Sequence, residues 1–190
     1  MKVGVLALQG AFREHCDALD ALGLEALEIR TCDDLVGCNS LILPGGESTV
    51  IAQLLASAGL VEPVRDRIRD GMPTLATCAG LILVAHEVLD GRADQISLDL
   101  LDARVRRNAY GSQRRSFEVP LRIEEVGDRP FVGVFIRAPV IVEAGSSVEV
   151  LASFGDHPVL VRTGALWAST FHPELSGDLR LHQRFLQEVP

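Results

Sequence analysis

The sequence of 190 residues has no apolar run approaching the roughly 20 residues that a membrane-spanning helix requires. Its first apolar run, residues 3–8, is short, lacks a small-residue cleavage site behind it and is soon followed by charged residues. This pattern predicts a buried strand and not a signal peptide. We therefore expect a cytoplasmic protein without membrane contact.

Paired cysteines and an excess of positive charge are also missing. The four cysteines, at positions 16, 32, 38 and 78, include no Cys-x-x-Cys pair, so neither a disulfide framework nor a zinc site is indicated. There are 18 Lys and Arg residues against 26 Asp and Glu, a formal net charge of −8. Because nucleic acids and anionic membranes are bound by basic surfaces, we expect neither as a partner. No metal and no cofactor is predicted.

The residues that are present, 47% hydrophobic and 23% charged, indicate a globular domain. In the first half, buried strands predicted at residues 3–8, 26–29, 41–43 and 73–77 alternate with helical patterns at 12–22, 50–58, 61–70 and 79–89. Strand-like runs then follow at 100–105, 117–123, 131–136, 148–154, 158–163 and 166–171, before a last helix at 179–189. The pattern predicts one α/β domain over residues 1–190, with a mostly parallel central sheet, helices on both faces and added antiparallel strands.

Three chemically useful features come directly after predicted strands. Gly45 and Gly46 follow the strand at 41–43, Cys78 follows the strand at 73–77, and His172 follows the strand at 166–171. In open α/β sheets, ligands bind beyond the carboxyl ends of the strands. We therefore expect these features to meet at one edge of the sheet.

Cys78 lies between a predicted strand and a predicted helix, within Ala76-Thr77-Cys78-Ala79-Gly80. This is the setting of a nucleophile elbow, where small neighbours permit a tight turn, and the start of a helix favours the thiolate. The alternative is that Cys78 is a small buried side chain, which is how most free cysteines behave. None of the other three cysteines is predicted at such a junction.

His172 and Glu174 could complete a catalytic triad with Cys78. Histidine can take a proton from a thiol and return one to a departing amine near neutral pH, and a carboxylate can orient the ring. Taken alone, a His-x-Glu pair is as well explained by a local hydrogen bond at a strand end. The remaining histidines, His15 among them, have no comparable setting, and His182 is predicted to pack on the apolar face of the last helix.

The segment Pro44-Gly45-Gly46-Glu47-Ser48 is a glycine turn that leads into a helix. Its backbone N–H groups could bind an anion, including the oxyanion of a tetrahedral intermediate, or the glycines could serve backbone geometry alone. The segment lacks the lysine and the spacing of a phosphate-binding loop, so no nucleotide site is predicted.

Together these motifs resemble class I, triad-type glutamine amidotransferases, a flavodoxin-like family. More narrowly, the chain is similar to the glutaminase subunits of pyridoxal 5'-phosphate synthases. The supporting segments are residues 4–15 (GVLALQGAFREH), 43–49 (LPGGEST), 77–80 (TCAG), 107–111 (RNAYG), 133–139 (GVFIRAP) and 171–175 (FHPEL). They extend over nearly the whole chain.

The resemblance implies that Cys78 attacks the glutamine amide and forms a thioester, with His172 as base and then acid and Glu174 orienting it. It implies an oxyanion hole from the N–H groups of Gly46 and Ala79. The glutamine site that it implies consists of Gly46, Glu47, Ser48, Arg107, Ile136 and Arg137. The implied partner is the synthase subunit, which receives the ammonia and makes pyridoxal 5'-phosphate.

One position departs from the family pattern, because Ala76 replaces the glycine that usually opens the elbow. The turn should survive if Ala76 has negative φ. Two other functions remain open: a cysteine hydrolase of the peptidase or deglycase type, and a regulatory subunit with a vestigial triad. Release of ammonia from glutamine, and its loss in Cys78→Ala, would separate the three.

Overall fold

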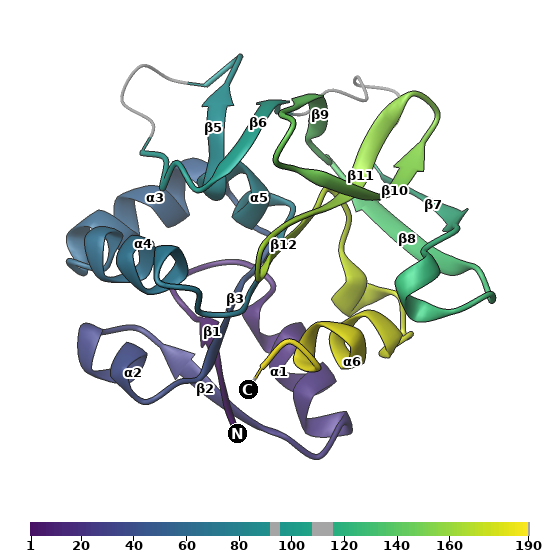
Figure 1. Cartoon of the computed structure of the whole chain (residues 1–190). Helices are drawn as coiled ribbons and strands as arrows, with labels where there is room; N and C mark the ends of the chain where they lie inside the picture. The colour runs from purple at the N-terminus through teal and green to yellow at the C-terminus, as the bar shows by residue number, and fades with distance from the viewer. Residues whose placement is uncertain (92–95, 108–115, 190) are drawn as a thin grey trace.

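A computed structural model of the chain describes residues 1–91, 96–107 and 116–189 (Figure 1). A seven-stranded sheet in the order β10-β11-β12-β4-β3-β1-β2 runs through the molecule. Its strands are β1 (Lys2–Leu6), β2 (Glu25–Ile29), β3 (Ser40–Leu43), β4 (Thr74–Thr77), β10 (Glu149–Phe154), β11 (His157–Thr163) and β12 (Leu166–Ser169).

Most of this sheet is parallel. The pairs β2–β1, β1–β3, β3–β4 and β4–β12 are all parallel, whereas β10 and β11 extend the β12 edge in antiparallel pairing. The predicted parallel core with added antiparallel strands is therefore confirmed.

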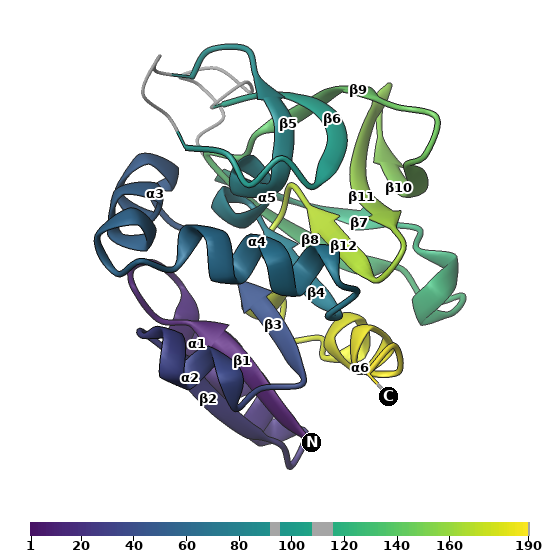
Figure 2. The ribbon, with the colours of Figure 1, turned by 60° about the vertical axis from the view of Figure 1, so that its left-hand side comes forward.

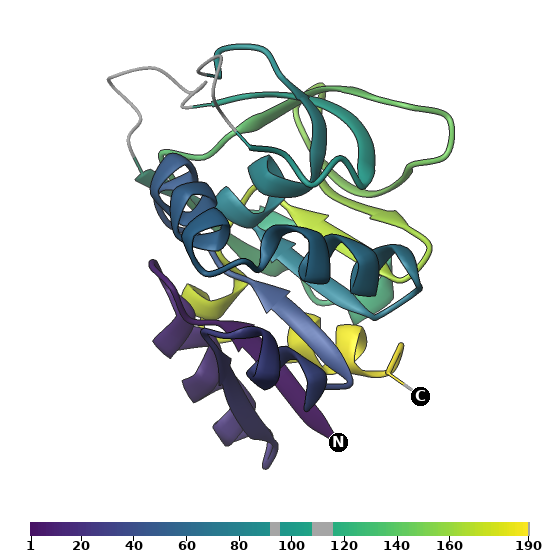
Figure 3. The ribbon, with the colours of Figure 1, turned by 90° about the vertical axis from the view of Figure 1, so that its left-hand side faces the viewer.

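Helices cover both faces of the sheet because its parallel strands are apolar on both sides. Alternate residues of β1 and β3 such as Val5 and Ile42 pack in one cluster with Leu19 and Phe185, on α1 (Phe12–Ala21) and α6 (Arg180–Leu186). The opposite face packs against α3 (Ser48–Ser57), α4 (Val61–Arg69) and α5 (Ala79–Val84). Figures 2 and 3 show α3 and α4 on one side of β3 and α6 on the other.

Two smaller sheets lie beside the central one. One contains β5 (Ala85–Val88), β6 (Leu101–Arg106) and β9 (Val140–Ala144), and the other pairs β7 (Ser116–Leu121) with β8 (Phe131–Ile136). Short 3-10 turns, η1 (Glu124–Val126) and η2 (Pro173–Leu175), follow β7 and β12. Among the residues that the structure describes, no helix is long and apolar enough to cross a membrane.

The structure differs from the sequence prediction in three elements. The helix predicted at 79–89 ends at Val84, and the next residues form β5 beside β6. Every residue of α5 is buried, so its sequence carries no amphipathic period to mark the end. Strand β9 was not predicted, nor was helix α2 (Cys32–Val36), although Thr31 and Asp34 form a capping box at its start.

The fold brings three strand ends together. Strands β3, β4 and β12 are neighbours and parallel, so their carboxyl ends lie at one edge of the sheet. Gly45 follows β3, Cys78 follows β4 and His172 follows β12 within three residues of each end. The predicted convergence is confirmed.

Candidate active site

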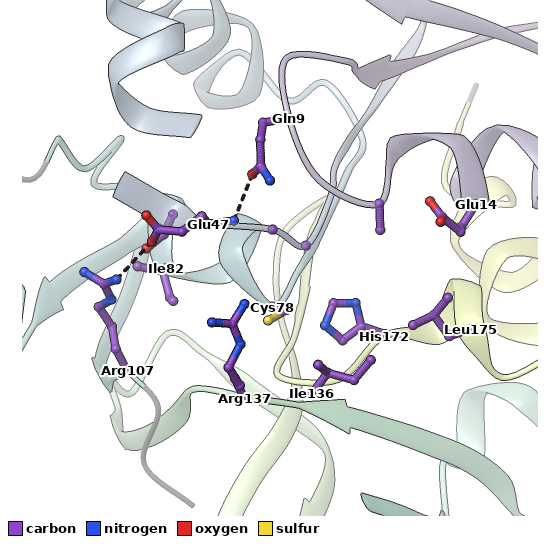
Figure 4. Close-up of a pocket in the computed structure, with 14 residues that line it drawn as sticks. Gln9, Glu14, Glu47, Cys78, Ile82, Arg107, Ile136, Arg137, His172 and Leu175 are labelled. Atoms are coloured by element: carbon purple, nitrogen blue, oxygen red, sulfur yellow. Dashed lines mark hydrogen bonds and ion pairs between the residues drawn. The ribbon is translucent and has the colours of Figure 1, made fainter. Parts of the chain in front are cut away.

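Cys78 occupies a strained turn between β4 and α5. Its φ of 48° and ψ of −97° lie in a region that residues with a side chain rarely adopt. Its N–H donates to Ser169 O of β12 at 2.8 Å, which fixes the turn to the neighbouring strand. This is the elbow conformation predicted from the sequence, and Figure 4 shows the sulfur facing the pocket.

Small residues around the elbow make the turn possible. A Cβ on Gly80 would lie 2.1 Å from the carbonyl oxygen of Leu43, so α5 can approach β3 only with glycine at this position. Ala76 lies in β4 without positive φ. Alanine at this position is therefore compatible with the turn.

His172 and Glu174 form a tight buried pair beside Cys78. His172 Nδ1 lies 2.7 Å from Glu174 Oε1, and the His172 N–H donates to Val134 O of β8 at 2.8 Å. Burial lowers the pKa of His172, but hydrogen bonds to Cys78 and Glu174 prevail and raise it to about 10. A protonated imidazole beside the sulfur favours the thiolate, which is the nucleophilic form.

The side chain of Glu174 is completely buried and remains ionised. Burial opposes its charge, yet contacts with His15 and His172 prevail and hold the pKa of Glu174 below its ordinary value. A carboxylate at this position favours a proton on His172 Nδ1, which leaves Nε2 able to accept a proton.

The glycine turn packs directly on the histidine. A Cβ on Gly45 would lie 2.3 Å from His172 Cε1 and 3.3 Å from Cys78 Cβ. A Cβ on Gly46 would lie 2.5 Å from Gln9 Oε1. Both glycines are therefore required by close approach, and the turn lies against the reactive groups.

Two backbone N–H groups at this place have no acceptor within the described part of the chain. Gly45 O accepts the Ala11 N–H at 2.9 Å, and a trans peptide directs the Gly46 N–H to the opposite side. Ala79 is the first residue of α5, where the N–H has no acceptor within the helix. Both groups can therefore donate to a developing oxyanion.

A cavity of about 450 Å³ opens over these groups. All the residues predicted from the sequence to bind glutamine line it: Gly46, Glu47, Ser48, Arg107, Ile136 and Arg137. Figure 4 shows Arg137 extending toward Cys78 from the end of β8, and this arginine has a φ of 44°, a strained value. Residues 108–111 of the segment that begins at Arg107 lie outside the described residues.

Polar groups at the α3 end of the cavity are organised around Glu47, the N-cap of α3. Glu47 Oε1 lies 3.1 Å from Arg107 Nη2 and accepts the Thr49 N–H at 3.3 Å. The buried Ser48 Oγ has no hydrogen-bond partner within the described residues. The cavity thus presents guanidinium groups and a carboxylate, the two signs of charge that recognition of a zwitterion requires.

The sequence interpretation missed Gln9 and misjudged Cys32 and His15. Gln9 lines the cavity and its Oε1 accepts the Glu47 N–H at 2.8 Å. Its position between Leu8 and Gly10, within one of the segments that carry the family resemblance, could have indicated a role at the site. Cys32 does open a helix after a strand, but it is exposed and lies in α2, away from the cavity lining. His15 is buried beside Glu174, a setting that no sequence pattern indicated.

Metal-ligating side chains are not gathered elsewhere in the described ranges, where no group of three His, Cys, Asp or Glu could hold an ion. All four cysteines lie in these ranges and are free. The reactive groups at the cavity are therefore a cysteine thiol, an imidazole and backbone N–H groups.

Known proteins similar to this chain match it over nearly its whole length. It is 50% identical over 189 residues to "Pyridoxal 5'-phosphate synthase subunit PdxT" of Moorella thermoacetica, with all of both chains covered. It is 56% identical over 186 residues to the protein of the same name in Thermus thermophilus, with 97% of this chain and 96% of that protein covered. A crystal structure described as a glutamine amidotransferase superposes with a TM-score of 0.93 at 52% identity, covering 98% of each chain. The SNO glutamine amidotransferase family model matches residues 5–190, and the chain belongs to that family.

Proposed function

We propose that this chain hydrolyses the side-chain amide of L-glutamine and supplies the ammonia to the synthase subunit of pyridoxal 5'-phosphate synthase. The observation that carries the proposal is the meeting of an elbow cysteine and a His172–Glu174 pair in one cavity beside two free N–H donors. Relatives at about half identity bear the name of that synthase subunit.

The first half of the reaction forms a thioester. The Cys78 thiolate attacks the amide carbon, a C–S bond forms, and the carbonyl π electrons move to oxygen. The N–H groups of Gly46 and Ala79 stabilise this oxyanion. When the intermediate collapses, the C–N bond breaks and His172 protonates the departing nitrogen, so ammonia leaves.

The second half regenerates the enzyme. His172, now neutral, takes a proton from water as the water oxygen attacks the thioester carbon. A second oxyanion forms at the same donors and collapses with cleavage of the C–S bond. The product leaves, its new carboxyl group gives its proton to the solvent to yield glutamate, and the thiolate–imidazolium pair is restored, while Glu174 holds His172 in one orientation throughout.

The rest of the cavity positions the substrate. Arg107 and Arg137 supply positive charge for the α-carboxylate, since a guanidinium can bond both of its oxygens. Glu47 and Ser48 face the α-ammonium end, and Ile136 contacts the aliphatic part. The product of the partner, pyridoxal 5'-phosphate, is not a cofactor in this reaction.

We assign the catalytic unit to one domain over residues 1–190 and its location to the cytoplasm, where free cysteines persist. The alternatives of a peptidase or deglycase and of a vestigial regulatory subunit lose support, because the chain belongs to an amidotransferase family and retains all three triad residue types.

The test is an assay of glutamate and ammonia release by the chain alone, with the synthase subunit, and with Cys78→Ala. We expect the chain alone to show weak activity and the synthase subunit to stimulate it. Cys78→Ala should lose both the basal and the stimulated activity. Cys32→Ala is the matched control, because Cys32 is exposed and outside the cavity lining. Partner-dependent activity that survives Cys78→Ala would contradict the proposed triad.

A further inference from the structure

A pair of buried histidines lies behind the proposed triad. His15 is on α1 and His182 is on α6, and both are fully buried. Figure 1 shows both helices on the same side of β1 and β3. His15 Nδ1 lies 3.0 Å from His182 Nε2, so one ring must donate to the other.

The other nitrogen of His15 faces the triad acid and the elbow strand. His15 Nε2 lies 3.4 Å from Glu174 Oε2 and 3.3 Å from the hydroxyl oxygen of Thr77, the residue before Cys78. Glu174 Oε2 is buried and has no hydrogen-bond partner within the described residues. His15 is thus the polar group placed to compensate the carboxylate oxygen that does not face His172.

These contacts select one tautomer of His15. A proton on Nε2 can be donated to Thr77 Oγ1 and lies beside the charge on Glu174 Oε2, 3.4 Å from the nitrogen; this tautomer leaves Nδ1 to accept the Nε2–H of His182. The opposite tautomer would bring the Nε2 lone pair against the carboxylate. In the favoured arrangement, the unpartnered Nδ1 of His182 carries a lone pair and no proton. This agrees with the rarity of buried N–H groups without an acceptor in proteins.

We propose that His15 is a positioning residue of the triad, whose Nε2–H lies beside Glu174 Oε2, compensates its charge and so keeps the carboxylate turned toward His172. This rests on the proposed function of Cys78, His172 and Glu174. A carboxylate held at one oxygen can turn about its terminal torsion, whose energy profile is broad. Contacts at both oxygens remove that freedom, and His182 holds His15 in the required tautomer.

The charges around His15 and His182 agree with a neutral His15. Burial lowers the pKa of His15, with Glu174 opposing and His172 adding to that effect, and burial lowers the pKa of His182 to about 3. The charged groups that face His15 are Glu14 from α1, together with Glu174 and His172 after β12. The pair therefore orients the acid without adding a second positive charge to the triad.

The experiment compares His15→Leu with His15→Gln in the complex with the synthase subunit. Leucine removes the N–H, so we expect kcat to fall about tenfold or more, with KM within about threefold of its original value. The acid limb of kcat/KM should move to higher pH, because Glu174 without its donor is protonated more easily. Glutamine carries an N–H at the same reach and should restore most of kcat and the original limb.

Leu19→Ala is the control for packing, since Leu19 is buried on the same helix in the apolar cluster. It should lower the unfolding temperature without moving the pH profile. Equal losses in Leu19→Ala and His15→Leu with unchanged profiles would overturn the proposal. A His15→Leu enzyme with the original kcat would overturn it as well, and Cys78→Ala then tells whether the triad itself stands.

The tautomer can be measured in the unaltered protein even if His15→Leu fails to fold. Long-range ¹⁵N–¹H correlation spectra distinguish the two neutral forms of each ring. We expect the proton of His15 on Nε2 and that of His182 on Nε2. A proton on Nδ1 of His15 would refute the proposed contact with Glu174.

Discussion

Replacing Gly45 by alanine should disable the enzyme while leaving the fold intact. The new Cβ would lie 2.3 Å from His172 Cε1 and 2.8 Å from Nδ1, where an ordinary contact needs at least 3.4 Å. The ring must therefore retreat by about 1 Å. Gly45 has no positive φ, so alanine adds no backbone strain and the effect comes from the displaced ring.

A displacement of this size is large for catalysis. A misplacement of about 1 Å costs on the order of 100-fold in rate, or about 2.7 kcal/mol of transition-state stabilisation. The hydrogen bond of 2.7 Å between His172 Nδ1 and Glu174 Oε1 must also lengthen or turn. We expect kcat/KM for glutamine to fall about 100-fold.

The assay is glutamate release with saturating synthase subunit, together with the rate at which iodoacetamide alkylates Cys78. Gly37→Ala is the matched control, because Gly37 has a φ of −78° and its Cβ would meet its nearest neighbour at 3.4 Å. It should retain full activity. A Gly45→Ala enzyme within threefold of the original kcat/KM and alkylation rate would refute the reasoning.

Three further predictions follow from the same site. The pKa of His172, raised to about 10, should appear as a high midpoint in an NMR titration, and this midpoint should fall in Cys78→Ala. Because the pKa is raised above the unfolded value of 6.5, the protonated ring stabilises the fold fully below pH 6.5, and this stabilisation is lost as the pH rises toward 10. A midpoint near 6.5 would contradict the prediction. Gly80→Ala forces a Cβ to 2.1 Å from Leu43 O and should lower the free energy of unfolding by about 3 kcal/mol in urea titrations, whereas an unchanged midpoint would contradict the packing argument. Arg137→Gln removes a charge-assisted contact and should raise KM for glutamine about 10- to 100-fold with less effect on kcat; an unaltered KM would exclude it from the substrate site.

Much of the fold follows from local pattern. The strands β3, β4 and β8 were predicted to within a residue or so because short buried runs flanked by glycine or proline are legible along the chain. Helix α5 was predicted too long because it is buried on all sides, and a helix without a polar face has no period that marks its end. Residues 85–88 form strand β5 because they pair with β6, which begins 13 residues after β5 ends.

The sequence by itself determined which side chains we propose as the catalytic groups, because a cysteine at a strand–helix junction, a His-Pro-Glu segment and a glycine turn each have a local meaning. Tertiary structure alone decided how they are held. His15 and His182 are 167 residues apart, and Glu174 meets His15 only because α1, α6 and β12 pack around the same end of the sheet. No local hydrophobic period or residue spacing predicts such a contact, because burial and hydrogen bonding between distant segments arise only when the chain has folded around its core.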